Sequence, residues 1–295
     1  MAVRDCTLAG PWKISVMRSA MAPRPVAVHQ PTFRQSSPTD RGEAKSTSHG
    51  LWGWRRLFSL VLVGSSLPKP ALASTASSAS TPTAVIFLHG SGDSGSGLKQ
   101  YIEALSDLVE ELEFRDVQTF WPNSSSQPYT LAGGIVMPIW YDRAGLAPSA
   151  PEKTDSVEKS VDSLMKLVRK VQASGVPPQR IIIGGFSMGG GIALQLALRH
   201  PEAIGGAFVL SSFMCDDAAV YGRVQAPELS KVPILMMHGE ADRFIRPSWG
   251  RGTFERLQSS GVDVDFVSVP GLQHEMNSKE IQLLRDWLFK TLQLD

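Results

Sequence analysis

The order of apolar and polar residues predicts strands and helices that alternate from residue 83 onward. Continuous apolar runs, typical of strands buried on both faces, occur at 84–88, 181–183, 207–210 and 232–237. Two further strands are predicted at 117–120 and 263–269, and alternation in the second places it nearer a sheet edge. Apolar residues three or four apart predict helices at about 98–110, 152–173, 188–199, 247–260 and 278–292.

Two of these predicted helices have a clear buried stripe. In 152–173 the stripe comprises Val157, Val161, Leu164, Val168 and Val171. In 278–292 it comprises Ile281, Leu284 and Leu288. Strands that alternate with helices indicate a mostly parallel sheet with helices on both faces, so the predicted fold class is α/β. Ligand sites in such sheets lie at the carboxyl ends of the strands.

Residues 1–82 differ from the rest, because they are rich in Ser, Pro, Arg and Ala and lack a hydrophobic period. Arg55-Arg56, the apolar run 57–67 and a small-residue site ending at Ala73 follow the order of a secretory-type signal. The run is too short for a stable membrane span. A bipartite leader cleaved after Ala73 and a disordered extension with a fortuitous apolar patch both fit. We therefore expect a leader at 1–82 and one catalytic domain at 83–295.

Composition and charge restrict the possible partners and cofactors. The chain has 295 residues, 42% of them apolar, and a net charge of +1. Nothing in this balance argues for a nucleic-acid partner. Cys6 and Cys215 are too few for a disulfide framework. No group of His, Cys and Glu has the spacing of a metal site, and we expect neither a metal nor a cofactor.

The most informative stretch is Ile181-Ile182-Ile183-Gly184-Gly185-Phe186-Ser187-Met188-Gly189. It contains the Gly-x-Ser-x-Gly pattern of the nucleophile elbow, between a predicted strand and a predicted helix. So sharp a turn strains the serine backbone, and small neighbours let it close. Because its hydroxyl would point out of the turn, Ser187 is the candidate nucleophile. An ordinary glycine-rich turn with an incidental serine is the alternative.

A serine hydroxyl needs a base, and His274 is the candidate. The base of this fold follows the acid in the chain and comes after the last strand. His274 is the histidine that meets this condition. His238 competes, but its position directly after a strand favours packing beneath the site. His200 is expected at a helix end and His89 in the first loop.

The base in turn needs an acid that orients it, and Asp242 is the leading candidate. It follows the strand predicted to end at Met237, at the correct end of the sheet. Glu240 lies nearby, and Asp216 and Asp217 are alternatives after an earlier strand. Asp263 and Asp265 are expected to face solvent from their strand.

Two backbone N–H groups are expected to bind the oxyanion of the reaction. One is that of Met188, directly after the nucleophile, and the other belongs to the loop after the first strand. In His89-Gly90-Ser91-Gly92 the expected donor is the Ser91 N–H. A phosphate-binding loop is disfavoured, because the remaining glycine spacing and the lysine of such motifs are absent.

These motifs together resemble the acyl-protein thioesterase/lysophospholipase family of α/β-hydrolases. The resemblance is carried by the loop 89–95, the segment from Gly133-Gly134 to Trp140-Tyr141-Asp142, the elbow, and the pair Asp242 and His274. It covers about 84–292. Thioesterases of the family usually have Gln after the serine, whereas this chain has Met188. The chain is therefore more similar to the lysophospholipase-like branch, and the difference argues against long-chain palmitoyl substrates.

The resemblance implies a serine acyl hydrolase with Ser187 as nucleophile, Asp242 as acid and His274 as base. The expected substrates are S-acylated proteins, small acyl esters or lysophospholipids. A carboxylesterase that prefers short acyl chains and a non-catalytic hydrolase-fold binding protein are the alternatives. Family members are typically cytosolic, whereas the leader indicates organelle or secretory targeting. The sequence leaves the oligomeric state undetermined.

Overall fold

A computed structural model of the protein describes residues 81–224 and 231–294. Its centre is a parallel sheet with the strand order β2-β1-β5-β6-β7-β8. These strands are β1 (Thr83–Leu88), β2 (Val117–Phe120), β5 (Ile181–Phe186), β6 (Gly206–Leu210), β7 (Ile234–Gly239) and β8 (Val264–Val269). As predicted, the strand at 264–269 lies at an edge.

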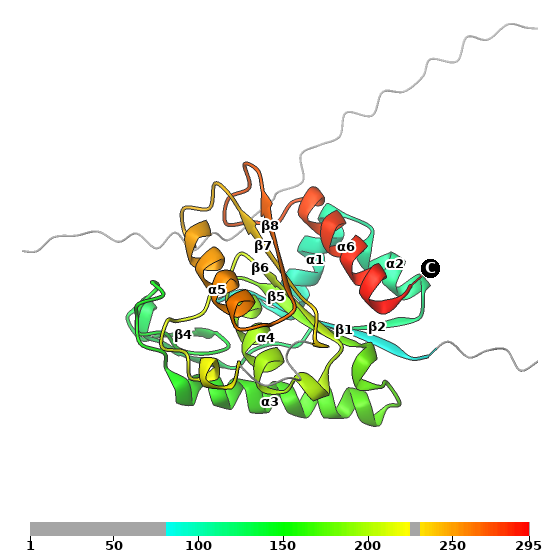
Figure 1. The fold of residues 1–295 in the computed structure, drawn as a ribbon, viewed down its shortest axis with the longest axis horizontal. Helices are drawn as coiled ribbons and strands as arrows, with labels where there is room; N and C mark the ends of the chain where they lie inside the picture. Colours follow the sequence, from blue (N-terminus) through cyan, green and yellow to red (C-terminus); the bar gives the residue numbers. More distant parts are fainter. Residues whose placement is uncertain (1–80, 225–230, 295) are drawn as a thin grey trace, which may run out of the picture. The chain divides into compact units, whose positions relative to one another are not determined.

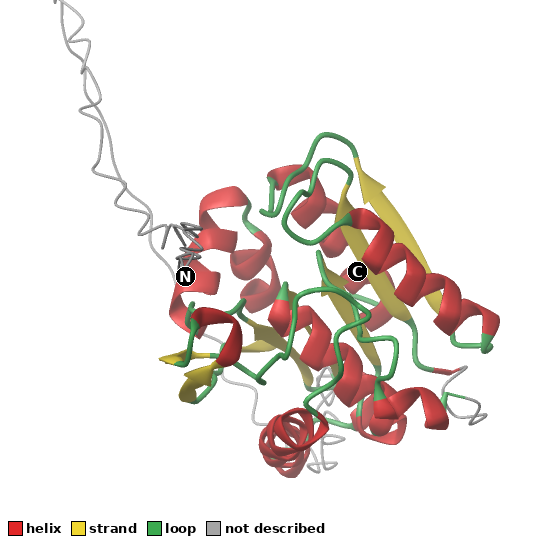
Figure 2. Ribbon diagram, turned by 90° about the vertical axis from the view of Figure 1, so that its left-hand side faces the viewer, coloured by secondary structure: helices red, strands yellow, loops and turns green. Residues whose placement is uncertain are grey.

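Helices cover both faces of this sheet (Figures 1 and 2). One face packs against α3 (Thr154–Ala173), α4 (Met188–Arg199) and α5 (Pro247–Ser259). The other packs against α1 (Gly95–Leu105), α2 (Leu108–Phe114) and α6 (Ser278–Leu292). Short 3₁₀ turns are η1 (Thr130–Ala132), η2 (Pro178–Arg180), η3 (Pro201–Ala203) and η4 (Ala219–Arg223). The predicted α/β class is confirmed.

The two faces of the sheet form two hydrophobic cores, because successive side chains of a strand point in opposite directions. In β1, Ile86 and Leu88 belong to the core under α3 and α4. Val85 and Phe87 belong to the core under α1, α2 and α6. All four are fully buried. Continuous apolar runs are therefore required in the central strands, and the carboxyl ends of these strands are held in fixed positions.

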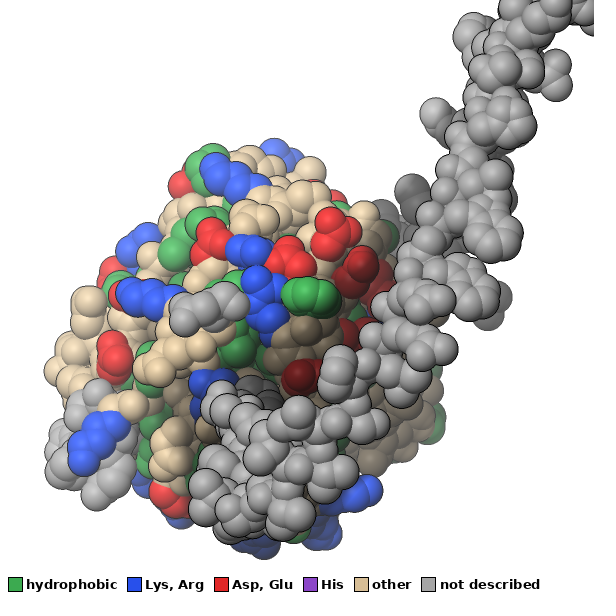
Figure 3. All heavy atoms as spheres, turned by 90° about the vertical axis from the view of Figure 1, so that its right-hand side faces the viewer, with side chains coloured by type: hydrophobic (Ala, Val, Ile, Leu, Met, Phe, Trp, Pro, Cys, Tyr) green, Lys and Arg blue, Asp and Glu red, His purple; other side chains and the backbone are tan. Residues whose placement is uncertain are grey.

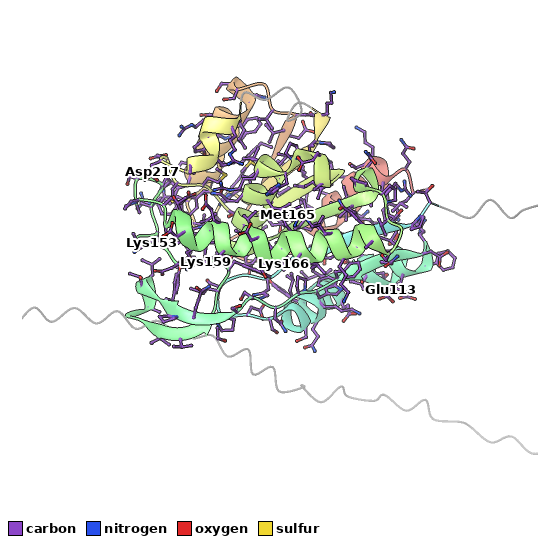
Figure 4. The ribbon with its side chains drawn as sticks, turned by 90° about the horizontal axis from the view of Figure 1, so that it is seen from below. Glu113, Lys153, Lys159, Met165, Lys166 and Asp217 are labelled. Carbon is purple, nitrogen blue, oxygen red and sulfur yellow. The ribbon has the colours of Figure 1, made fainter. Side chains whose placement is uncertain are left out.

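Helix α3 shows the predicted stripe. Its buried residues include Val157, Val161, Leu164, Val168 and Val171, and the helix packs against α4. Figure 4 views α3 from its outer side, where the exposed Lys159 and Lys166 are labelled. The helix therefore forms an outer layer that supports α4, the helix that follows the elbow.

Helix α6 also has its predicted stripe, with Ile281, Leu284 and Leu288 fully buried. On its outer side the Arg285 Nε donates to Glu111 Oε2 of α2 at 2.7 Å. Figure 3 views the side on which α2 and α6 lie, where basic and acidic side chains are intermixed. This side therefore does not form a surface of one charge.

Three sequence predictions differ from the structure or fall outside it. The single helix at 98–110 is wrong, because Ser106 is extended (φ −168°, ψ 168°) and separates α1 from α2. The connection 123–150 contains an antiparallel hairpin of β3 (Ser126–Tyr129) and β4 (Ile135–Pro138). The predicted leader lies outside the described residues except for 81 and 82, so its boundary stays a prediction.

Candidate active site

The elbow is a strained turn between β5 and α4. Ser187 has φ 54° and ψ −120°, a conformation that is unfavourable for a residue with a side chain. Its N–H donates to Leu210 O at 2.8 Å, which ties the turn to the end of β6. A Cβ on Gly185 or Gly189 would lie 2.2 or 2.1 Å from Leu88 O. Glycine is therefore required for β1, β5 and α4 to meet here, and their contact supports the strained serine.

His274, in the loop between β8 and α6, lies between Ser187 and Asp242. Its Nδ1 is 2.7 Å from Asp242 Oδ2, and its Nε2 is 3.0 Å from Ser187 Oγ. Because the ionised carboxylate only accepts hydrogen bonds, Nδ1 carries the proton and donates. The unprotonated Nε2 then accepts from the serine hydroxyl. The residues predicted as nucleophile, base and acid form one hydrogen-bonded line.

Asp242 is a buried carboxylate with several donors. It is 3% exposed and lies three residues after the end of β7. The Oδ1 atom accepts from Phe244 N–H at 2.9 Å and Ile245 N–H at 2.8 Å. Burial alone would raise the pKa of this carboxyl, but hydrogen bonds from His238, His274 and the backbone outweigh burial and lower the pKa below its ordinary value. Asp242 is therefore ionised at neutral pH.

Two aromatic rings flank the imidazole of His274. The Phe186 ring centroid is 4.9 Å from that of His274, and the Phe244 centroid is 5.1 Å away. Phe186 precedes the nucleophile, and Phe244 follows the acid and is 57% exposed. Together these rings restrict how the imidazole can turn. Their positions in the chain indicate no such role, because each contact joins residues far apart in sequence.

The loop after β1 also lies close to the elbow. A Cβ on Gly90 would lie 3.6 Å from the Ser187 Cβ, so this loop passes beside the serine. The Gly92 N–H donates to Pro138 O at 2.7 Å, and the Asp93 N–H donates to Gly90 O at 3.3 Å. Both are thereby engaged within the protein. The Ser91 N–H is the remaining candidate of the three.

Met188 begins α4, and the first N–H groups of a helix have no partner within that helix. The Met188 N–H is thus available at the positive end of the helix. Its side chain is only 3% exposed and belongs to the core. Methionine in place of the glutamine that is usual in the thioesterases therefore changes packing behind the elbow. The contribution proposed for Met188 in the reaction comes from its backbone N–H.

His89 holds the loop that contains Ser91. It is fully buried; its Nδ1 donates to Gly90 O at 2.7 Å and its Nε2 accepts from Ser124 N–H at 3.0 Å. The indole N–H of Trp140 donates to His89 O at 2.8 Å. Burial lowers the pKa of His89, which favours the neutral ring that this pairing requires. The sequence predicts that His89 belongs to this loop, but no local pattern indicates that it holds the loop in place.

The other residues considered from the sequence do not form part of the line from Ser187 through His274 to Asp242. His238 is 1% exposed and lies in β7 rather than after it. His200 is at the C-terminal end of α4, as expected. Exposed acidic side chains are Glu240, Asp216, Asp217, Asp263 and Asp265. Cys215 is a buried free thiol. None of these acidic groups shares the contacts that Asp242 makes with His274.

Within 81–224 and 231–294, no helix is long and apolar enough to cross a membrane. Over the same residues, no cluster of three or more His, Cys, Asp or Glu side chains could hold a metal ion.

Comparison with known sequences identifies the family. The phospholipase/carboxylesterase family matches residues 71–292. Lysophospholipase-like protein 1 of Mus musculus is 36% identical over 208 residues, which are 70% of this chain and 86% of the mouse protein. Acyl-protein thioesterase 1 homolog 1 of Dictyostelium discoideum is 34% identical over 214 residues, which are 70% of this chain and 90% of that protein. The predicted family resemblance is confirmed.

Solved structures agree with this assignment. SOBER1 of Arabidopsis thaliana is 28% identical with a TM-score of 0.63, and the match covers 72% of this chain and 99% of the other. Acyl-protein thioesterase 2 of Zea mays is 26% identical, also with a TM-score of 0.63, and the match covers 72% of this chain and 94% of the other. The chain therefore belongs to the phospholipase/carboxylesterase family, and it is an acyl hydrolase with an α/β-hydrolase fold.

Proposed function

We propose that this protein hydrolyses acyl thioesters or esters with Ser187 as nucleophile, His274 as general base and Asp242 as the orienting acid. The observation that carries the proposal is the continuous line of contacts from Ser187 Oγ through His274 to Asp242 Oδ2, at 3.0 and 2.7 Å. A nucleophile, a base and an orienting group within hydrogen-bond reach are the arrangement that activates a serine.

In the first half of the reaction, Ser187 Oγ attacks the acyl carbonyl carbon while its proton passes to His274 Nε2. Asp242 stabilises the resulting imidazolium through the Nδ1–H bond without itself taking the proton. The negative charge that develops on the carbonyl oxygen is received by the N–H groups of Ser91 and Met188. Collapse of this intermediate breaks the bond to the thiolate or alkoxide, which leaves with the proton from His274 Nε2.

In the second half, water replaces the leaving group. His274 Nε2 takes a proton from this water, and the hydroxide attacks the acyl-serine carbonyl. The same two N–H groups receive the charge, after which the proton returns to Ser187 Oγ and the carboxylic acid is released. His274 therefore needs one unprotonated and one protonated nitrogen at the start of each half, which agrees with the tautomer that its contacts specify.

The proposed substrates are S-acylated proteins, small acyl esters or lysophospholipids. Relatives named as thioesterases and as carboxylesterases support this range. Because the Met188 side chain is buried, the residue beside the nucleophile does not favour short over long acyl chains by direct contact. Rates on acetyl, octanoyl and palmitoyl thioesters would distinguish a thioesterase for long chains from an esterase for short ones.

The direct test of the proposal is Ser187→Ala. We expect turnover of a p-nitrophenyl ester to fall by about 10⁶-fold, because the nucleophile is lost, while circular dichroism and thermal unfolding stay close to those of the parent protein. A fluorophosphonate probe should label the parent protein and not the variant. Retained turnover in purified Ser187→Ala would rule the assignment out, and labelling of the parent would exclude a non-catalytic binding protein.

A further inference from the structure

We infer that His238 is a second histidine of the active site, a positioning residue that holds the loop of the acid Asp242 in its productive place. The inference rests on the proposed function, because it concerns the orientation of Asp242 toward His274. The sequence alone favoured a packing role for His238. Its contacts with the loop after β7 indicate a more specific one.

The His238 side chain lies against the acid loop. Its Nε2 is 2.9 Å from Ile245 O and 3.5 Å from Asp242 Oδ2. Ile245 O is a carbonyl oxygen that can only accept, so Nε2 carries the proton and donates to it. The same N–H lies on the side of Asp242 that also receives His274 Nδ1–H, since both contact Oδ2.

The bond to Ile245 closes a small ring of contacts around the acid. Ile245 donates its N–H to Asp242 Oδ1 at 2.8 Å, while its carbonyl accepts from His238. A single residue thereby connects the carboxylate to the histidine at the end of β7. Strand β7 thus fixes the loop, and the loop fixes the carboxylate that His274 contacts.

The surroundings of His238 leave its ring little freedom. The ring is 1% exposed. A Cβ on Gly250 of α5 would lie 2.4 Å from His238 Nδ1 and 3.0 Å from Ser212 O. A larger residue at position 250 would therefore displace the imidazole. The absence of a side chain there allows α5 to close against the ring.

Two titratable side chains of the described residues meet where His238 contacts the loop of Asp242. Asp242 faces it from its own loop, and His274 contacts the same carboxylate oxygen from the loop after β8. The α5 residue that packs against the ring, Gly250, carries no charge. Any effect of His238 on the pH dependence of activity therefore passes through Asp242 and His274.

The test compares three substitutions of one residue. His238→Leu removes the N–H, His238→Asn keeps an amide that is too short to reach Ile245 O, and His238→Gln keeps an amide of matching length. We expect kcat for a p-nitrophenyl ester to fall about 100-fold in His238→Leu and His238→Asn, with little change in KM. The reason is that a misplaced Asp242 stabilises the transition state less and leaves substrate binding unchanged. His238→Gln should stay within about tenfold of the parent protein.

The pH profile separates positioning from a general structural role. In His238→Leu and His238→Asn the acid limb of kcat/KM should move to lower pH, because a loosely held Asp242 stabilises the His274 imidazolium less. His238→Gln should keep the parent limb. The matched control is His200→Gln at the end of α4, which should change neither kcat nor the limb. Thermal unfolding of each variant shows which are folded, and the Asn and Gln pair decides the question if His238→Leu does not fold.

Three outcomes would each count against one of the two claims. If Ser187→Ala is inactive while folded His238→Asn keeps the parent kcat and acid limb, the positioning role is wrong and the proposed function stands. If Ser187→Ala retains turnover, the proposed function itself fails. A His238→Gln variant as impaired as His238→Asn would also overturn the inference, because the N–H donor would then not be what matters.

Discussion

Two buried carboxyl groups lie near the loop that contains His274, and their surroundings differ completely. Asp242, after β7, is 3% exposed and accepts hydrogen bonds from His274 and two backbone N–H groups. Glu280, in the first turn of α6, is fully buried, and neither of its oxygens has a hydrogen-bond partner among the described residues. The pKa of Asp242 is lowered, whereas burial raises that of Glu280 to about 8.

The difference shows that burial does not determine whether a carboxyl group is charged. Burial raises the pKa of both groups, and only Asp242 has donors that outweigh it. Asp242 is consequently an anion at neutral pH, as the proposed reaction requires, while Glu280 is largely protonated. Substitution of Asp242 should therefore change mainly catalysis, and substitution of Glu280 should change mainly stability.

The largest effect is expected at Asp242. Asp242→Asn should lower kcat by about 10⁴-fold, because the amide favours the wrong tautomer of His274 and no longer stabilises its imidazolium. Steady-state kinetics on a p-nitrophenyl ester would measure the loss. KM should change little, since the proposed role of Asp242 is to stabilise the transition state.

The control for that experiment is Asp216→Asn, at an exposed carboxylate in the segment after β6. It should leave kcat close to that of the parent protein. A comparable loss in both variants would show that charge removal in general, rather than the position of Asp242, affects turnover.

The next effect concerns stability at Glu280. Its folded pKa of about 8 is above its ordinary value of 4.5, so between these values the folded state binds more protons than the unfolded state. The contribution of Glu280 is therefore fully present below about pH 4.5 and is lost as pH rises to about 8. Glu280→Gln should remove this loss and raise the free energy of unfolding at pH 8 by on the order of 2 kcal/mol.

Urea unfolding at pH 5 and pH 8 would measure this difference. The variant should gain stability at pH 8 relative to the parent and gain much less at pH 5, while kcat stays unchanged. An equal change at both pH values would mean that packing, rather than ionisation, explains the effect. Asp242 has the opposite sign: its lowered pKa contributes stability above its ordinary value of 3.8, and this contribution is lost in acid.

The smallest effect is expected at Tyr101, which connects α1 to the loop that contains His274. Its hydroxyl donates to Met276 O at 3.0 Å and accepts from Met276 N–H at 3.2 Å. Tyr101→Phe should lower the free energy of unfolding by about 1 kcal/mol. The loss is small because Tyr101 is 37% exposed, so water can take over the hydrogen bonds of the lost hydroxyl. Kinetics should show only a small change in kcat, and a loss as large as that of Asp242→Asn would contradict this ranking.

Much of the fold could be predicted, because its signals are local. The apolar runs of β1 and β5 and the stripes of α3 and α6 require only that neighbouring side chains share a face. The break at Ser106 and the hairpin of β3 and β4 were missed. Each is held by a distant part of the chain: the Gly92 N–H donates to Pro138 O of the hairpin, and the Ser278 hydroxyl donates to Leu105 O beside the break. No periodicity in these segments reveals either bond.

The sequence by itself determined the sheet class, the strained turn at Ser187 and the chain order in which Asp242 and His274 follow it, because each depends on neighbouring residues or on the order of strands. Only the tertiary structure decided which surroundings each group has. Ser187 and His274 are 87 residues apart, yet Ser187 Oγ and His274 Nε2 are 3.0 Å apart. That distance and the donors around Asp242 follow from how parallel strands bring distant loops together at the carboxyl end of the sheet.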